Sequence, residues 1–176
     1  MRKLRNEELK RLSKEEFTRS EKIPVIVVLD NVRSLHNVGS VFRTADAFRV
    51  ASIYLCGITA TPPHREIHKT ALGADETVNW QHFESCAEAV ADLKSRQWMI
   101  WAVEQAEGSI PLDELHFTEG LKAAVIFGNE INGIGEDVMK LADVCVEIPQ
   151  TGTKHSLNIS VSAGIVIWEL WKKLNG

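Results

Sequence analysis

Short apolar runs alternate with amphipathic stretches along this chain. The first run, residues 25–29, follows Pro24 and is almost entirely β-branched, which is typical of a strand buried on both faces. Further apolar runs predict strands at 52–56, 77–80, 99–103, 123–127 and 144–148, and helical patterns lie between most of them, as at 83–96 and 135–141. This alternation predicts an α/β fold, with a mostly parallel sheet and helices on both faces.

The two ends of the chain differ in character. Residues 6–19 predict an opening helix, and residues 1–22 hold eight Lys or Arg against five Glu. Such a basic arm is compatible with contacts to phosphate, but equally with a solvated helix carrying ion pairs such as Glu7 with Arg11. The last helix, beginning near Asn158, is apolar around much of its circumference. We therefore expect this helix to be enclosed by more than one surface or to lie in a subunit interface.

Length and composition limit the architecture. The chain has 176 residues, of which 44% are hydrophobic, and its net charge is −4. We expect a basic helical arm over 1–22 and a single α/β domain over 23–176. No apolar run approaches the roughly 20 residues of a membrane span, and no secretory signal opens the chain, so we expect a cytoplasmic protein without a membrane partner. Cys56, Cys86 and Cys145 indicate reduced core thiols, because they are odd in number and mostly set in apolar segments.

Ligands of parallel sheets collect beyond the carboxyl ends of the strands, and three polar segments follow predicted strands. In the first, a helix is predicted to begin near Gly39, with Arg43 off its apolar stripe. Helical side chains lean toward the N-terminus, so the guanidinium is expected to return to the strand-end cleft. The simpler alternative is that Asn37 caps the helix and Arg43 is a surface cation paired with Asp46 or Asp30.

The other two polar segments follow later strands. Residues 128–135 contain three glycines, which allow positive φ angles and let the backbone approach a ligand closely. Their spacing fits neither a P-loop nor a dinucleotide-binding fingerprint. In the third segment, Ser156, Asn158 and Ser160 all favour helix starts, and capping would explain one of the three.

Together these segments resemble the SpoU/TrmH branch of the SPOUT RNA 2′-O-ribose methyltransferases. The motif Asn-x-Gly-x-x-x-Arg is met by Asn37, Gly39 and Arg43; Gly-Asn-Glu-x-x-Gly by Gly128, Asn129, Glu130 and Gly133; and Ile-Pro…Ser-Leu-Asn-x-Ser by Ile148, Pro149, Ser156, Leu157, Asn158 and Ser160. All three occur in the family's order, each just after a predicted strand. Two features depart from the family: Gln150 stands where Met is common, and residues 151–155 are unusually polar.

The resemblance implies a fold, a reaction and a site. It implies a C-terminal trefoil knot, a homodimer through the last helix and knot region, and methylation of a ribose 2′-hydroxyl of tRNA or rRNA with S-adenosylmethionine as methyl donor. It implies that the donor is held by Val103, Gly128, Ile148 and Leu157, and that catalysis uses Arg43, Asn37, Glu130, Ser156 and Asn158. None of this chemistry needs a metal.

Two other interpretations explain less of the sequence. A catalytically silent RNA-binding or assembly module on the same fold would have no chemical reason to keep all five candidate catalytic residues. A flavodoxin-like or receiver-type domain using Asp30 would leave the segment around Asn158 unexplained. For Arg43 we expect electrostatic activation and phosphate anchoring, because a guanidinium gives up its proton very reluctantly.

Overall fold

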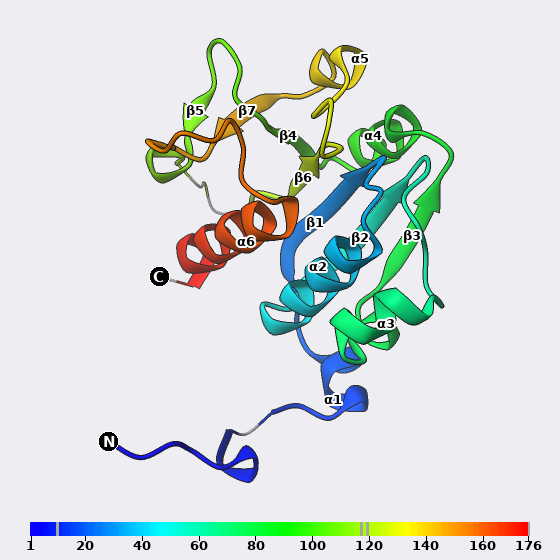
Figure 1. Cartoon of the computed structure of the whole chain (residues 1–176), viewed down its shortest axis with the longest axis vertical. Helices are drawn as coiled ribbons and strands as arrows, with labels where there is room; N and C mark the ends of the chain where they lie inside the picture. Colours follow the sequence, from blue (N-terminus) through cyan, green and yellow to red (C-terminus); the bar gives the residue numbers. More distant parts are fainter. Residues whose placement is uncertain (10, 117, 119, 176) are drawn as a thin grey trace.

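A seven-stranded parallel sheet organises the part of the chain that this computed structural model describes, residues 1–9, 11–116, 118 and 120–175 (Figure 1). The strand order is β3-β2-β1-β6-β4-β7-β5, and every paired neighbour is parallel. The strands are β1 (Ile23–Asp30), β2 (Val50–Cys56), β3 (Trp80–Phe83), β4 (Met99–Val103), β5 (Ile110–Pro111), β6 (Ala123–Phe127) and β7 (Val144–Glu147). The predicted α/β class with a largely parallel sheet is confirmed.

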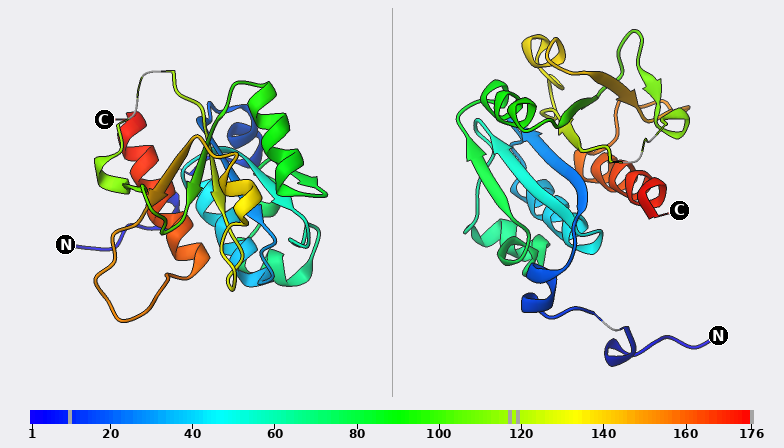
Figure 2. Two further views of the ribbon diagram at one scale, coloured as in Figure 1. Left: turned by 90° about the horizontal axis from the view of Figure 1, so that it is seen from above. Right: turned by 180° about the vertical axis from the view of Figure 1, so that it is seen from behind.

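Helices cover both faces of this sheet (Figures 1 and 2). The α-helices of the described chain are α1 (Lys14–Arg19), α2 (Leu35–Ala47), α3 (Arg65–Ala71), α4 (Cys86–Ser95), α5 (Glu136–Met139) and α6 (Ile159–Asn175). Short 3₁₀ turns add to them, at Asn6–Leu9, Ala74–Glu76 and Leu112–Glu114. Helices α2, α3 and α6 pack on one face, with α2 and α6 in contact, whereas α4 and α5 pack on the other.

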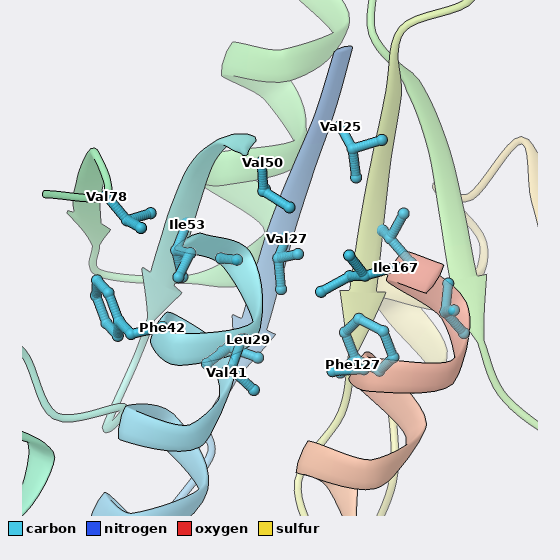
Figure 3. Packing of buried hydrophobic residues seen from close by; sticks show 14 of the residues in the cluster. Val25, Val27, Leu29, Val41, Phe42, Val50, Ile53, Val78, Phe127 and Ile167 are labelled. Atoms are coloured by element: carbon cyan, nitrogen blue, oxygen red, sulfur yellow. The ribbon is translucent and has the colours of Figure 1, made fainter. Parts of the chain in front are cut away.

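Alternate residues of β1 enter the two halves of the core. Val25, Val27 and Leu29 pack beneath α2 and α6, as Figure 3 shows, whereas Ile26 and Val28 point to the face covered by α4 and α5. All five are at most 2% exposed. The continuous apolar run therefore reflects a strand buried on both faces, as predicted.

Several predicted boundaries are wrong. The opening helix over 6–19 is instead a 3₁₀ turn followed by the separate helix α1, because Ser13 starts a new helix in a capping box with Glu16. Lys10, one of the cations of the predicted arm, lies outside the described residues. The strand expected at 77–80 runs from Trp80 to Phe83 instead, so α4 begins at Cys86 rather than at 83.

Helix α2 was predicted to begin near Gly39, but it begins four residues earlier. Ser34 caps it and accepts from the Asn37 N–H at 3.3 Å, so Asn37 is not the cap. A Cβ on Gly39 would lie 2.0 Å from Thr70 Oγ1 and 2.4 Å from the Ile67 carbonyl oxygen. Glycine at this position thus lets α2 and α3 pack closely.

Helix α6 buries one face and exposes another. Ile159, Ala163, Val166, Ile167 and Leu170 are buried in the core.

The exposed apolar stripe of α6 is formed by Val161, Ile165 and Trp168, which are 49%, 38% and 49% exposed. The Trp168 ring stacks on Trp171 and meets the edge of Phe48 of the segment after α2.

Two further expectations concern thiols and membranes. Cys56, Cys86 and Cys145 are free thiols, and the first two are buried. Within the described residues, no helix combines the length and the hydropathy that crossing a bilayer requires.

Candidate active site

A cavity of about 570 Å³ opens at the carboxyl ends of β4, β6 and β7, beside the start of α6. Its volume is within the range of small-molecule sites. The four residues predicted to hold the methyl donor all line it: Val103, Gly128, Ile148 and Leu157. Of the predicted catalytic residues, Glu130, Ser156 and Asn158 line it too. The structure thus brings together seven of the nine candidates from segments far apart in sequence.

Asn37 joins this group through hydrogen bonds. Its side-chain nitrogen donates to Glu130 Oε1 at 3.1 Å, and its side-chain oxygen accepts from Asn158 Nδ2 at 3.2 Å. The first turn of α2, the loop after β6 and the start of α6 are therefore linked by three polar side chains at the mouth of the cavity.

Glu130 is held as a carboxylate by the loop before α2. The backbone N–H groups of Arg33 and Ser34 donate to its two oxygens at 3.3 and 3.4 Å. Burial alone would raise the pKa of Glu130, but the hydrogen bonds from backbone N–H groups and from the Asn37 amide lower it overall. Glu130 is therefore an anion at neutral pH.

Gly128 has a packing role that the sequence interpretation missed. Asn129 and Gly133 form a two-way backbone bridge, with N–H···O distances of 3.1 and 3.0 Å. A Cβ on Gly128 would lie 2.1 Å from the carbonyl carbon of Gly133 and 2.3 Å from the nitrogen of Ile134. Glycine is required here for the chain to fold back on itself. The positive φ of +64° at Gly133 fits the same turn.

Glu104, directly after β4, is a cavity residue that sequence reasoning did not identify. Its carboxylate accepts from the Ile134 N–H at 3.3 Å and from the Gln105 N–H at 3.0 Å. Gln105 Nε2 in turn donates to the His155 carbonyl oxygen at 3.0 Å and so anchors the polar loop 151–155. The only signal available in the sequence was the position of Glu104 at a strand end.

Asn158 combines the capping and functional interpretations. Its Oδ1 accepts from the Ser160 N–H at 2.9 Å and from the Ser160 hydroxyl at 2.6 Å, which caps α6. Its Nδ2 remains to donate to Asn37. Ser156 makes no side-chain hydrogen bond within the described part of the chain.

Arg43 lies elsewhere. It is exposed on α2, as expected, but it does not line the cavity; it lines a second hollow beside the N-terminal arm. The ion pairs considered for it are not formed in the described structure, since Asp46 accepts from the Thr77 hydroxyl at 2.9 Å and Asp30 from Asn31 at 2.8 Å. Within one chain, Arg43 is therefore separate from the other candidate catalytic residues.

Comparison with known proteins gives consistent matches. The model of the SpoU rRNA Methylase family matches residues 24–168. A tRNA (guanosine(18)-2'-O)-methyltransferase of Thermus thermophilus is 31% identical over 162 residues, which cover 92% of this chain and 81% of that protein.

Two solved structures share the fold. An AdoMet-bound rRNA methyltransferase from Sinorhizobium meliloti superposes with a TM-score of 0.80 at 25% identity, covering 89% of this chain and 59% of that one. A protein solved in a study of the 2-OH methylation of C/U34 on tRNA superposes with a TM-score of 0.76 at 27% identity, covering 88% and 99%. Sequence motifs, sheet, cavity and comparisons agree, and the chain belongs to the SpoU rRNA methylase family.

Proposed function

We propose that this chain transfers a methyl group from S-adenosylmethionine to a ribose 2′-hydroxyl of tRNA or rRNA in the cytoplasm. The observation that carries this proposal is the cavity that joins all four predicted donor-binding residues to Glu130 and Asn158. The relatives named above act on tRNA or rRNA, and one of the superposed structures contains AdoMet.

The cavity suits the methyl donor. Its walls combine apolar side chains, such as Val103 and Ile148, with backbone groups of the loop after β6 and the carboxylate of Glu104. Such a mixture fits a ligand with an aromatic base, a ribose and a charged amino-acid end. When bound, the donor supplies an activated methyl group on a sulfonium.

The polar residues at the cavity mouth would position the ribose. Asn37 and Asn158 carry amide groups held by one another, and Glu130 fixes the loop before α2. Holding two reactants in line can lower a barrier by roughly 7 to 11 kcal/mol in favourable systems. The unbonded Ser156 hydroxyl is available to contact the target nucleotide.

Arg43 would stabilise the 2′-oxygen as it becomes partly anionic, because a fixed cation favours developing negative charge. In one chain it does not line the cavity. We therefore propose a homodimer, assembled through α6 and the adjacent C-terminal region, in which Arg43 of one subunit completes the cavity of the other. The exposed stripe Val161, Ile165 and Trp168 supports this assembly, since such patches mark contact surfaces.

The family's trefoil knot is part of the proposal. The chain after β7 makes a long excursion through residues 148–158 before α6 begins, and it contacts the loop after β4 through Gln105 and His155. If the C-terminal segment is threaded past that loop, the knotted segments themselves form the walls of the donor-binding cavity.

The decisive experiment is isothermal calorimetry with S-adenosylmethionine, followed by mapping of 2′-O-methyl groups across cellular RNA with and without this protein. We expect donor binding and the loss of specific methyl groups when the protein is absent. A protein that binds RNA but not the donor would be the catalytically silent module instead.

A further inference from the structure

A second hollow, of about 630 Å³, lies between the N-terminal arm and the C-terminal half of α2. The arm side is formed by the start of α1 and the residues before it, and the body side by the last turns of α2, by the turn that follows α2 and by the residue after the 3₁₀ turn Ala74–Glu76. Its lining residues are Arg11, Leu12, Ser13, Lys14, Phe17, Arg43, Asp46, Ala47, Arg49 and Thr77. Of these residues, Arg43 alone belongs to the proposed catalytic set.

Three of the lining side chains are guanidinium groups that are not ion-paired in the described part of the chain. Arg11, Arg43 and Arg49 make no ion pair and no side-chain hydrogen bond within the described residues. The one carboxylate of the lining, Asp46, accepts a hydrogen bond from Thr77 at 2.9 Å.

The fourth cation of the hollow helps to hold the arm. Lys14 forms an ion pair with Glu76 of the 3₁₀ turn after α3, which joins α1 to the body of the protein. Phe17 is buried against the core beside it. The docked arm therefore places Arg11 and Lys14 in the same hollow as Arg43 and Arg49.

The positive charge of the hollow extends beyond its lining. The pKa of the Lys22 ammonium is lowered, mainly by burial and to a smaller extent by the positive charge of Arg49. Like charges are thus gathered in a chain whose net charge is −4. Such a concentration of cations favours an anionic ligand, because it is relieved when an anion binds.

We propose that this hollow binds phosphates of the RNA backbone that flank the methylated nucleotide. The inference rests on the proposed function and adds the substrate's docking surface to it. Guanidinium forks match phosphate oxygens in pairs. Arg43 lines the hollow, and in the proposed dimer it completes the partner subunit's cavity, so the hollow lies beside the site at which the nucleotide is methylated.

The test compares RNA binding by charge-neutralised variants. Arg11→Gln and Arg49→Gln each remove one cation from the hollow, and Arg19→Gln is the matched control, since Arg19 is exposed on α1 outside the hollow. The probe is a fluorescein-labelled RNA stem-loop, titrated by anisotropy at several salt concentrations with the full-length protein.

We expect Arg11→Gln and Arg49→Gln to weaken RNA binding about three- to tenfold near 0.1 M salt, and to reduce the slope of log K against log salt by about one. Arg19→Gln should stay within about twofold of the parent. Parent-like binding by both hollow variants overturns the proposal. So does an equal loss in Arg19→Gln, which would indicate diffuse arm charge.

Two further measurements complete the test. An acidic peptide with the same charge as the RNA is the second probe. If the peptide binds as tightly as the RNA and this binding is lost in the same variants, the ligand of the hollow is an acidic protein segment and the proposal is overturned. Calorimetry with S-adenosylmethionine on the same proteins separates this inference from the proposed function. If the parent binds the donor while the hollow variants bind RNA normally, only the inference fails; if the parent does not bind the donor, the proposed function fails.

Discussion

The side chain of Asn158 donates a hydrogen bond to the side chain of Asn37 across 121 residues of sequence, with the two atoms 3.2 Å apart. The Asn37 side chain in turn donates a hydrogen bond to Glu130, whose carboxylate also accepts hydrogen bonds from two backbone N–H groups of the loop before α2. The starts of two helices and the loop after β6 are thus held in register by a few polar contacts. Changes at any of these residues should disturb the whole mouth of the cavity.

The first prediction concerns the pH dependence of stability. The pKa of Glu130 is lowered from its usual value of 4.5, so its carboxylate stabilises the fold above that value and loses this contribution as the pH falls through the lowered value. Glu130→Gln should be less stable to urea than the parent at pH 7, and the difference should shrink below pH 4.5. Glu84→Gln, which changes an exposed carboxylate without hydrogen bonds in the described chain, is the control. A difference that is the same at neutral pH and well below the lowered pKa would contradict the assignment.

The second prediction concerns the close approach of α2 and α3. Gly39→Ala places a methyl group against Thr70 Oγ1 and the Ile67 carbonyl, and overpacking of this kind typically costs about 1 to 3 kcal/mol. Urea unfolding should show this loss. Gly39→Ala combined with Thr70→Ala should recover part of it, because one of the two obstructing atoms is removed. Full stability of Gly39→Ala alone would show that the helices separate without cost.

The third prediction separates the role of Arg43 in catalysis from folding. Arg43→Ala should change stability by no more than about 0.5 kcal/mol, because the residue is exposed. Donor affinity should persist, whereas methyl transfer should fall by roughly a hundredfold or more. Lys at this position should rescue only partly, since it lacks the planar fork. Methylation at near the parent rate would leave Arg43 as a surface cation.

Mixed dimers test which subunit Arg43 serves. Chains carrying Arg43→Ala keep an intact cavity, and chains carrying Gly128→Ala keep Arg43 but have a disrupted cavity wall. If Arg43 acts across the interface, co-refolding the two inactive variants should restore up to about a quarter of the parent activity, because half of the dimers are mixed and each has one complete site. No restoration would contradict the action of Arg43 across the interface.

The fourth prediction concerns assembly. Ile165→Glu puts a charge in the exposed apolar stripe of α6 and should convert dimers to monomers. Light scattering at micromolar protein concentration measures this change. Leu72→Glu is the matched control, since Leu72 is 66% exposed at the end of α3 and should leave the dimer intact. A parent protein that is monomeric and active at that concentration would refute the proposed dimer.

The fold was predictable where apolar burial dominates. The strands at 99–103 and 123–127 match β4 and β6 because their runs are buried on the sheet. Helix α3 was missed because only Ile67 and Ala71 of its seven residues are buried, which leaves little periodicity. β3 was misplaced because it is an edge strand. Its first and last residues are partly buried and the two between them are exposed, so no apolar run marks it.

The site was predictable from motifs but not from geometry. The order of the motifs after successive strands placed seven residues at one cavity, since the carboxyl ends of parallel strands meet at one edge. The position of Arg43 depends on the exact start of α2, because a start four residues earlier places Arg43 about 6 Å further along the helix from the strand ends. The packing reason for Gly128 was invisible because it depends on the fold of the following hairpin.

The contact of Gly39 with α3 limits where residues can be inserted into or deleted from this chain. It fixes the rotation of α2 about its own axis, and α2 carries Asn37 near its start and Arg43 nearly two turns later. One inserted residue between them would turn Arg43 by about 100° and shift it by about 1.5 Å. Insertions and deletions should therefore be excluded from the span between Asn37 and Arg43.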